Sequence, residues 1–92
     1  MSVDVDDTAA PAVANATAVL EYLTRQLVDH PDSVAVEVAH ERGKTTLNVR
    51  VAAGDLGRVI GKRGRTANAI RAVVRSTAVV RDGVEVDVEF LD

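Results

Sequence analysis

Apolar residues begin to recur every three or four positions at Asn15, and this spacing continues to about His30. The pattern predicts one amphipathic helix, with Asn15 as the N-cap that accepts a hydrogen bond from the first turn. The helix should end at His30 because helical backbone angles are disfavoured for the residue before a proline, here Pro31. Its buried face should comprise Ala16, Val19, Leu20, Leu23 and Leu27.

Three later segments alternate apolar and polar residues, which is the pattern of a strand with one buried face. The first two are joined by a short turn, residues 41–44, in which Gly43 supplies the positive φ that a tight hairpin needs. The third follows a turn at Gly83. The apolar positions of the three predicted strands are Val34, Val36 and Val38, then Leu47, Val49 and Val51, and finally Val84, Val86, Val88 and Phe90.

Two further helices are predicted between the second and third strands. A short helix should cover Leu56 to Ile60 with Asp55 as its N-cap, and a longer one should run from Arg65 to about Val80. The element order is therefore α-β-β-α-α-β, which predicts an α+β fold with a three-stranded sheet packed on one side by helices. The buried face of the longer helix should hold Ala67, Ile70, Val73, Val74 and Thr77.

The first fourteen residues differ from the rest of the chain, because they contain three aspartates, no basic residue and no apolar periodicity. This composition predicts a disordered acidic tail over 1–14, followed by a single domain over 15–92. The absence of cysteine excludes disulfides, thiolate metal sites and a cysteine nucleophile. No apolar run reaches about 18 residues and the start is not signal-like, so we expect a cytoplasmic protein without a membrane span.

Charge is distributed unevenly along the chain. Its 11 basic and 14 acidic side chains give a formal charge of −3, which as an average argues against a nucleic-acid ligand. Residues 57–81, however, hold seven bases and no acid, whereas the remainder holds four bases and fourteen acids. Like charges one helical turn apart repel, so this segment favours an anionic ligand over a merely solvated face. The seven bases are Arg58, Lys62, Arg63, Arg65, Arg71, Arg75 and Arg81.

The centre of this basic segment is the sequence V-I-G-K-R-G-R, residues 59–65. Its two glycines let the backbone approach a ligand closely and place N–H groups at the start of the following helix, where anions are favoured. A bare G-x-x-G is more often an ordinary helix end, but the flanking bases favour a cradle for phosphates. The spacings of Walker A and dinucleotide-binding motifs are not met, and a helix-turn-helix reader remains an alternative.

This motif follows D-L-G-R and precedes A-N-A-I-R, and together these residues resemble the G-x-x-G loop of KH RNA-binding domains. More narrowly, the stretch from about Ala16 to Asp92 resembles the small stand-alone bacterial KH proteins of the KhpA group. The resemblance implies a type II KH fold whose loop clamps the backbone of a few nucleotides of single-stranded RNA. It implies a clamp of Gly61, Lys62, Arg63 and Gly64, a groove for bases lined in part by Val59 and Ile60, and flanking contacts from Arg58, Arg65 and Asn68.

The resemblance further implies a partner, either a second copy of the chain or a KH protein of the KhpB or Jag type. It also implies a role as an RNA chaperone or post-transcriptional regulator linked to cell elongation and division. No cofactor, metal site or catalysis is expected, because His30 and His40 are poorly spaced for a metal and the acids of the final strand suggest a solvated face. The alternative function is a KH-fold protein-interaction module, for dimerisation or scaffolding, in which RNA binding is incidental.

Overall fold

The computed structural model of the chain describes residues 12–92, so most of the predicted acidic tail lies outside the described residues. Helices and strands follow the predicted order, and short helical turns accompany them. These turns are Pro31–Ser33 (η1), Lys62–Gly64 (η2) and Ala78–Asp82 (η3). The helices are α2 (Ala14–Leu27), α3 (Leu56–Ile60) and α4 (Arg65–Thr77), and the strands are β1 (Ala35–Glu41), β2 (Lys44–Arg50) and β3 (Val86–Leu91).

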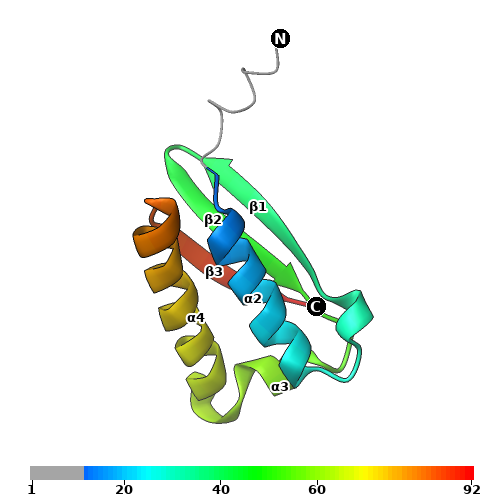
Figure 1. Cartoon of the computed structure of the whole chain (residues 1–92). Helices are drawn as coiled ribbons and strands as arrows, with labels where there is room; N and C mark the ends of the chain where they lie inside the picture. Colours follow the sequence, from blue (N-terminus) through cyan, green and yellow to red (C-terminus); the bar gives the residue numbers. More distant parts are fainter. Residues whose placement is uncertain (1–11) are drawn as a thin grey trace.

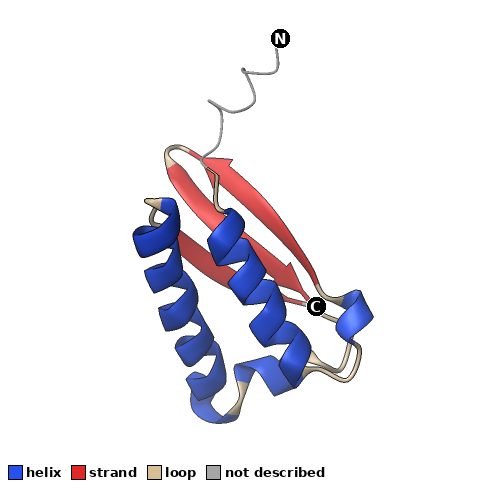
Figure 2. Cartoon of the chain, viewed as in Figure 1, coloured by secondary structure: helices blue, strands red, loops and turns tan. Residues whose placement is uncertain are grey.

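The three strands form one sheet in the order β1-β2-β3. β1 and β2 are antiparallel, whereas β2 and β3 are parallel, so that Leu47 lies between Val38 and Val88. Parallel neighbours need a crossover connection, and α3 and α4 supply it. Helices α2 and α4 lie side by side over the same face of the sheet (Figures 1 and 2). The predicted α+β architecture, with helices packed on one side, is confirmed.

The turn between β1 and β2 is a two-residue hairpin loop formed by Arg42 and Gly43. Both residues have positive φ, 53° and 79°, which is typical of a type I′ turn and matches the twist of paired strands. Glu41 and Lys44 are partners on either side of it. The predicted hairpin at residues 41–44, with Gly43 at positive φ, is therefore confirmed.

The core lies between the sheet and the two long helices. Three residues predicted to be buried are exposed, namely Leu27 at 37%, Val38 at 44% and Val73 at 48%. Leu27 is the last residue of its helix, and Val38 belongs to an edge strand that lies beside α2 rather than beneath it (Figure 1). Val73 lies on the outer side of α4, and Ala78 is buried one turn further on instead. The largest fully buried side chains are those of Leu20, Thr24, Leu47, Val49, Val59 and Val74.

Helix α2 differs from the prediction at both ends. Asn15 is not the N-cap: the helix begins at Ala14, and Val13 at the cap position makes no side-chain cap hydrogen bond. Val13 is buried in the core, so residues 13 and 14 of the predicted tail pack with the folded part of the chain. The helix ends at Leu27, before the 3-10 turn that starts at Pro31.

The start of α2 is capped by a residue distant in sequence, Asp82. Its carboxylate accepts hydrogen bonds from the backbone N–H groups of Asn15 and Ala16, at 3.2 and 2.9 Å. It also accepts one from the side-chain amide of Asn15 at 2.8 Å. A helix start leaves four backbone N–H groups without intrahelical partners, and Asp82 satisfies two of them.

The end of α4 differs from the prediction in a way that makes this cap possible. The α-helix stops at Thr77 rather than near Val80, and the π-helical turn Ala78–Asp82 follows it. Gly83, with a φ of 70°, then turns the chain toward β3. The π-helical turn contacts α2 and so brings the Asp82 carboxylate to the helix start.

The same contacts change the acidity of Asp82. Burial raises the pKa of its carboxyl group, but the hydrogen bonds from Asn15 and Ala16 and the charge of Arg81 outweigh burial and hold the pKa below the ordinary 3.8. A group whose pKa is lowered in the folded state stabilises the fold above its ordinary pKa. This contribution is lost as the pH falls through the folded-state pKa.

Replacing Asp82 by Ala should destabilise the protein by about 1 kcal/mol at neutral pH, because backbone N–H groups at the start of α2 lose their acceptor. The matched control is Asp92→Ala, which removes an exposed carboxylate that has no hydrogen bond within residues 12–92. Urea unfolding gives the free energy of unfolding of each variant. The difference between them should shrink as the pH falls below 3.8. Equal free energies at neutral pH would contradict the cap.

Candidate nucleic-acid interface

The predicted G-x-x-G segment forms a tight loop between α3 and α4, at the end of the molecule opposite the β1–β2 hairpin (Figure 1). Its backbone is mostly left-handed, since Gly61, Arg63 and Gly64 have φ values of 73°, 57° and 73°. Two backbone hydrogen bonds close the loop, from Gly61 N to Gly57 O at 3.0 Å and from Gly64 N to Gly61 O at 3.2 Å. The loop is therefore a defined turn whose shape depends on its glycines.

The two loop glycines are needed for different reasons. A Cβ atom on Gly61 would lie 2.8 Å from the Cβ of Thr66 and would overlap its hydroxyl oxygen, because the loop packs directly on the first turn of α4. The ψ of Gly61, 179° at positive φ, is also accessible essentially only to glycine. A Cβ on Gly64 would meet nothing within 4 Å. Gly61 thus shapes the loop, and Gly64 leaves space in front of the helix start.

Three cationic side chains lie at this helix start. Lys62, Arg63 and Arg65 are exposed, and none of them forms an ion pair with another residue in the described range 12–92. Gly64 occupies the N-cap position without a side-chain cap, so the first turn of α4 has no side-chain acceptor for its N–H groups. The positive end of the helix dipole and three unpaired cations share one end of α4, an arrangement that favours an anion such as phosphate.

The other four bases of the basic segment lie apart from this cluster. Arg58 on α3 pairs with Asp29 at 3.0 Å. Arg71 lies in the middle of α4, where it contacts β3, and Arg75 is exposed one turn further on. Arg81 belongs to the turn that caps α2, at the far end of the crossover. The seven bases of the basic segment therefore do not form one surface. Only Lys62, Arg63 and Arg65 lie together at the start of a helix, and these three have no ion-pair partner among residues 12–92.

The residues expected to line and flank the groove have different environments. Val59 is fully buried in the core, so its side chain supports α3 from inside and does not reach a ligand. Ile60 is half-buried beside the loop, and Arg65 and Asn68 are exposed on α4. The Oδ1 atom of Asn68 accepts a hydrogen bond from Nη1 of Arg71 at 3.0 Å. Ile60, Arg65 and Asn68 are thus accessible next to the loop, whereas Val59 is not.

Asp55 holds the start of α3, and with it the loop, against the preceding part of the chain. Asp55 occupies the predicted N-cap position of α3, but its side chain makes no cap hydrogen bond there. Its carboxylate accepts a hydrogen bond from the backbone of His30 at 3.0 Å and lies 3.1 Å from His30 Nδ1. Burial raises the pKa of Asp55, but the hydrogen bonds from His30 and from the backbone of Asp29 hold it below 3.8.

Arg71 is one of the seven bases of the basic segment, but its contacts were not predicted from the sequence. Its Nε donates to the backbone carbonyl of Val88 at 3.2 Å, and its guanidinium lies 5.1 Å from the centre of the Phe90 ring, a cation–π distance. Together with the bond to Asn68, these contacts tie α4 to the edge strand β3. Phe90, the one aromatic residue of the final strand, is the only sequence feature that pointed to a cation–π partner. No local spacing shows that positions 71 and 90 are neighbours.

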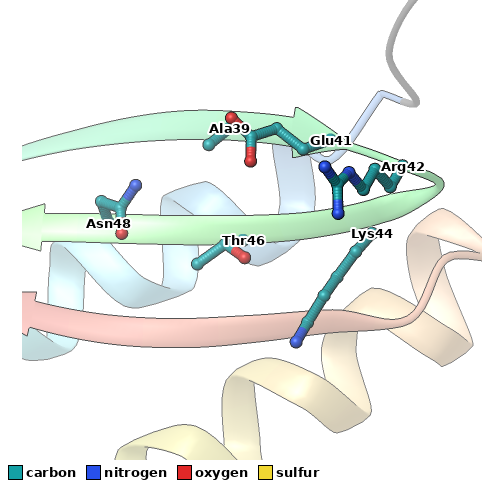
Figure 3. A pocket seen from close by; sticks show the side chains of 6 residues that line it. All are labelled: Ala39, Glu41, Arg42, Lys44, Thr46 and Asn48. Carbon is teal, nitrogen blue, oxygen red and sulfur yellow. The ribbon is translucent and has the colours of Figure 1, made fainter.

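A hollow lies on the face of the sheet opposite the helices, beside the β1–β2 hairpin (Figure 3). Its charges are mixed, and Lys44 pairs with Asp87 of β3 at 3.1 Å. Arg42 is the one cation of this lining without an ion pair in the described range 12–92, so the surface lacks the group of three unpaired cations found at the loop. The lining residues are Ala39, Glu41, Arg42, Lys44, Thr46 and Asn48.

Neither histidine belongs to a metal site in the described part of the chain. His30 contacts Asp55, and His40 Nδ1 lies 2.9 Å from the hydroxyl of Thr45. Across residues 12–92, no group of three or more His, Cys, Asp or Glu side chains is placed to hold a metal ion. None of the helices in that range is both long and apolar enough to cross a bilayer.

A three-stranded sheet with β2 and β3 parallel, helices on one face and a G-x-x-G loop between α3 and α4 defines a KH domain of type II. Residues 17–90 match the family described as KhpA/KhpB, KH domain. The chain is similar to the RNA-binding protein KhpA of Streptomyces coelicolor, at 47% identity over 73 residues that cover 79% of this chain and 90% of the relative. The chain therefore belongs to the KhpA/KhpB family of KH-domain proteins, which is a non-catalytic family.

Two further relatives agree with this assignment, and two solved structures agree with the fold. Proteins also called RNA-binding protein KhpA from Mycobacterium tuberculosis and Chlamydia trachomatis are 44% and 38% identical, over 79% of this chain and 89% and 92% of their own lengths. A variant of Aquifex aeolicus Era, bound to GDP and AlF4−, matches with a TM-score of 0.59 at 21% identity. Era in complex with MgGDPNP and nucleotides 1506–1542 of 16S ribosomal RNA matches equally well. Both matches cover 83% of this chain but 29% of Era, and at this identity they show the fold alone.

Gly61→Ala should destabilise the protein more than Gly64→Ala. The loss for Gly64→Ala should be about 1 kcal/mol, the cost of a Cβ in left-handed backbone. Gly61→Ala should cost at least about 2 kcal/mol, because the overlap with Thr66 adds to backbone strain. Urea unfolding of both variants measures the difference, and each serves as the control for the other. Equal losses would show that α4 does not constrain Gly61.

Proposed function

We propose that this protein binds single-stranded RNA and that the loop of Gly61, Lys62, Arg63 and Gly64 clamps the sugar-phosphate backbone. The observation that carries the proposal is the group of exposed cations, unpaired among the described residues, at a helix start without a side-chain cap. A phosphate at this position would accept hydrogen bonds from backbone N–H groups and would relieve repulsion among the cations. The name shared by the KhpA relatives supports the same ligand.

Single-stranded RNA suits this surface better than a duplex. A KH domain holds splayed-out bases beside its loop and reads them by their edges, which a duplex hides. The accessibility of Ile60, Arg65 and Asn68 next to the loop supports such contacts. A stacking platform is not possible here, since Tyr22 lies on α2 and Phe90 is buried beneath Arg71. We therefore expect binding through the backbone, base edges and aliphatic contact.

Changing both Lys62 and Arg63 to Asp should leave the fold intact and remove most of the RNA affinity. Both side chains are exposed, and aspartate tolerates the left-handed backbone at position 63. Fluorescence anisotropy with a labelled single-stranded oligonucleotide at fixed salt should show a loss of at least about tenfold. Circular dichroism and the melting temperature should stay close to those of the wild type. The salt dependence of wild-type binding should correspond to a few phosphates, at roughly 0.7 per contact.

The matched control is the double variant Arg42→Asp and Arg50→Asp, which changes the net charge equally at exposed positions outside the loop. Arg42 also has left-handed backbone, with a φ of 53°, so the control includes the same kind of position as Arg63. This variant should keep most of the RNA affinity. An equal loss in both double variants would mean that binding follows net charge alone, and the clamp would be contradicted.

We further propose that the protein acts in the cytoplasm as an RNA chaperone or post-transcriptional regulator linked to cell elongation and division. Its partner would be a second copy of the chain or a KH protein of the KhpB or Jag type, and a family description that joins KhpA with KhpB supports pairing. The acidic surplus outside the basic segment would restrict RNA contact to the loop side of the molecule. The acids of that surplus in residues 1–11 lie outside the described residues.

A second candidate function is a KH-fold protein-interaction module, and exposed apolar side chains favour it. In the π-helical turn that follows α4, Val79 and Val80 are 53% and 73% exposed. Val73 on α4 and Tyr22 on the neighbouring α2 are exposed as well. A single exposed apolar residue is ordinary, but several on two adjacent helices suit a partner surface.

Sedimentation velocity of the wild type and of the Lys62→Asp/Arg63→Asp variant, with and without RNA, separates the two functions. If protein interaction is the main role, both proteins should form the same assembly without RNA, because the loop would not be needed. If RNA binding is the main role, the complexes that wild type forms with RNA should be absent for the variant. A wild type that stays monomeric at every concentration, without partner or RNA, would contradict self-association.

A further inference from the structure

We propose that Arg71 reads a base of the bound RNA and selects bases that present two adjacent hydrogen-bond acceptors. The inference rests on the proposed function, because it concerns a base of the same bound strand. Arg71 lies outside the loop and is not among the residues expected to clamp or flank the strand. Its role would be in specificity, whereas the loop supplies affinity without regard to sequence.

The guanidinium of Arg71 is held in one orientation by three independent contacts. Its Nε donates to Val88 O at 3.2 Å, its Nη1 donates to Asn68 Oδ1 at 3.0 Å, and its Cζ atom lies 5.1 Å from the centre of the Phe90 ring. These partners come from two elements, α4 and β3. An arginine fixed in this way loses little further conformational freedom when it binds a ligand, which is the condition for selective recognition.

The contacts leave part of the guanidinium free to donate. The group has five N–H bonds, and the structure uses one on Nε and one on Nη1. Both N–H bonds of Nη2 and the second of Nη1 have no acceptor among the described residues, and Arg71 forms no ion pair there. Two neighbouring nitrogens with free N–H bonds are a bidentate donor.

Arg71 stands where a strand held at the loop would pass. It follows Gly64 by about two helical turns, or roughly 10 Å along α4. Asn68 lies between them, one turn from each, on the same side of the helix. Beyond Arg71 lies the edge strand β3, and Arg71 donates a hydrogen bond to the Val88 carbonyl of this strand. A base directed from the loop toward β3 would therefore meet the free N–H bonds of Arg71.

The chemistry of a bidentate donor separates the four bases. Guanine presents O6 and N7 as adjacent acceptors, and cytosine presents N3 and O2. Adenine places an amino donor next to N7, and uracil places an N–H donor between its two carbonyls, so neither offers such a pair on these edges. A phosphate also accepts from a bidentate arginine, but that contact would not distinguish one base from another.

The test is Arg71→Lys, which keeps the charge and loses the planar fork. Affinities for single-stranded oligo-G, oligo-C, oligo-A and oligo-U of equal length should be measured by anisotropy at fixed salt. The wild type should favour G, C or both over A and U by about tenfold, and the variant should lose most of this preference. The loss of affinity that Arg71→Lys causes for oligo-G, compared with the loss for oligo-C, tells which of the two bases Arg71 reads. Asn68→Ala, which leaves the arginine in place but releases Nη1, should lower the preference in part.

The control is Arg75→Lys, one turn further along α4, where none of the three contacts is made. It should leave the base preference unchanged, and melting temperatures should confirm that all variants are folded. Equal wild-type affinity for the four oligonucleotides would overturn the inference while the RNA-binding function stands. If Arg71→Lys lowers the affinity for all four oligonucleotides by the same factor, the inference is also overturned, because such a loss would indicate a contact with phosphate. No wild-type binding to any oligonucleotide would overturn the proposed function itself, and the inference with it.

Discussion

The parallel pairing of β2 and β3 is the constraint on which the rest of this domain depends. Parallel neighbours cannot be joined by a tight turn, so the chain leaves the end of β2, passes through α3, the loop and α4, and returns to the start of β3. This crossover puts the G-x-x-G loop at one end of the sheet and the turn that carries Asp82 at the other. It also lays α4 along the edge of β3, which brings Arg71 to Val88 and Phe90.

A carboxylate holds each end of the crossover, and neither carboxylate pairs with a cation of the loop. Asp82 binds the start of α2, and Asp55 binds His30 before α3. In both, hydrogen bonds to the charged form outweigh burial, so the pKa is lowered and the groups are ionised at neutral pH. These acids neutralise no loop cation. A chain with net charge −3 therefore keeps an exposed positive cluster at one helix start.

Periodicity predicted the order of the elements, the hairpin and the bounds of α3, because each depends on residues that are close in the chain. The errors share one cause. The side chains of Asn15 and Asp55 were interpreted as caps of α2 and α3, yet both side chains bond to residues elsewhere in the fold. Val38 and Val73 fit an apolar pattern, but burial also requires a neighbouring element above them, and an edge strand and the outer side of a helix have none close enough to cover them fully.

The amino-acid sequence was sufficient for the KH class, the G-x-x-G loop and the uneven charge, because motif, spacing and charge are properties of neighbouring residues. It could not show that Val59 is enclosed in the core, that Arg58 is paired with Asp29, or that the loop cations are unpaired. The bonds of Arg71 to Val88 and of Asp82 to Asn15 join residues 17 and 67 positions apart. Such pairs arise when the crossover folds α4 back between α2 and β3, and no local pattern records them.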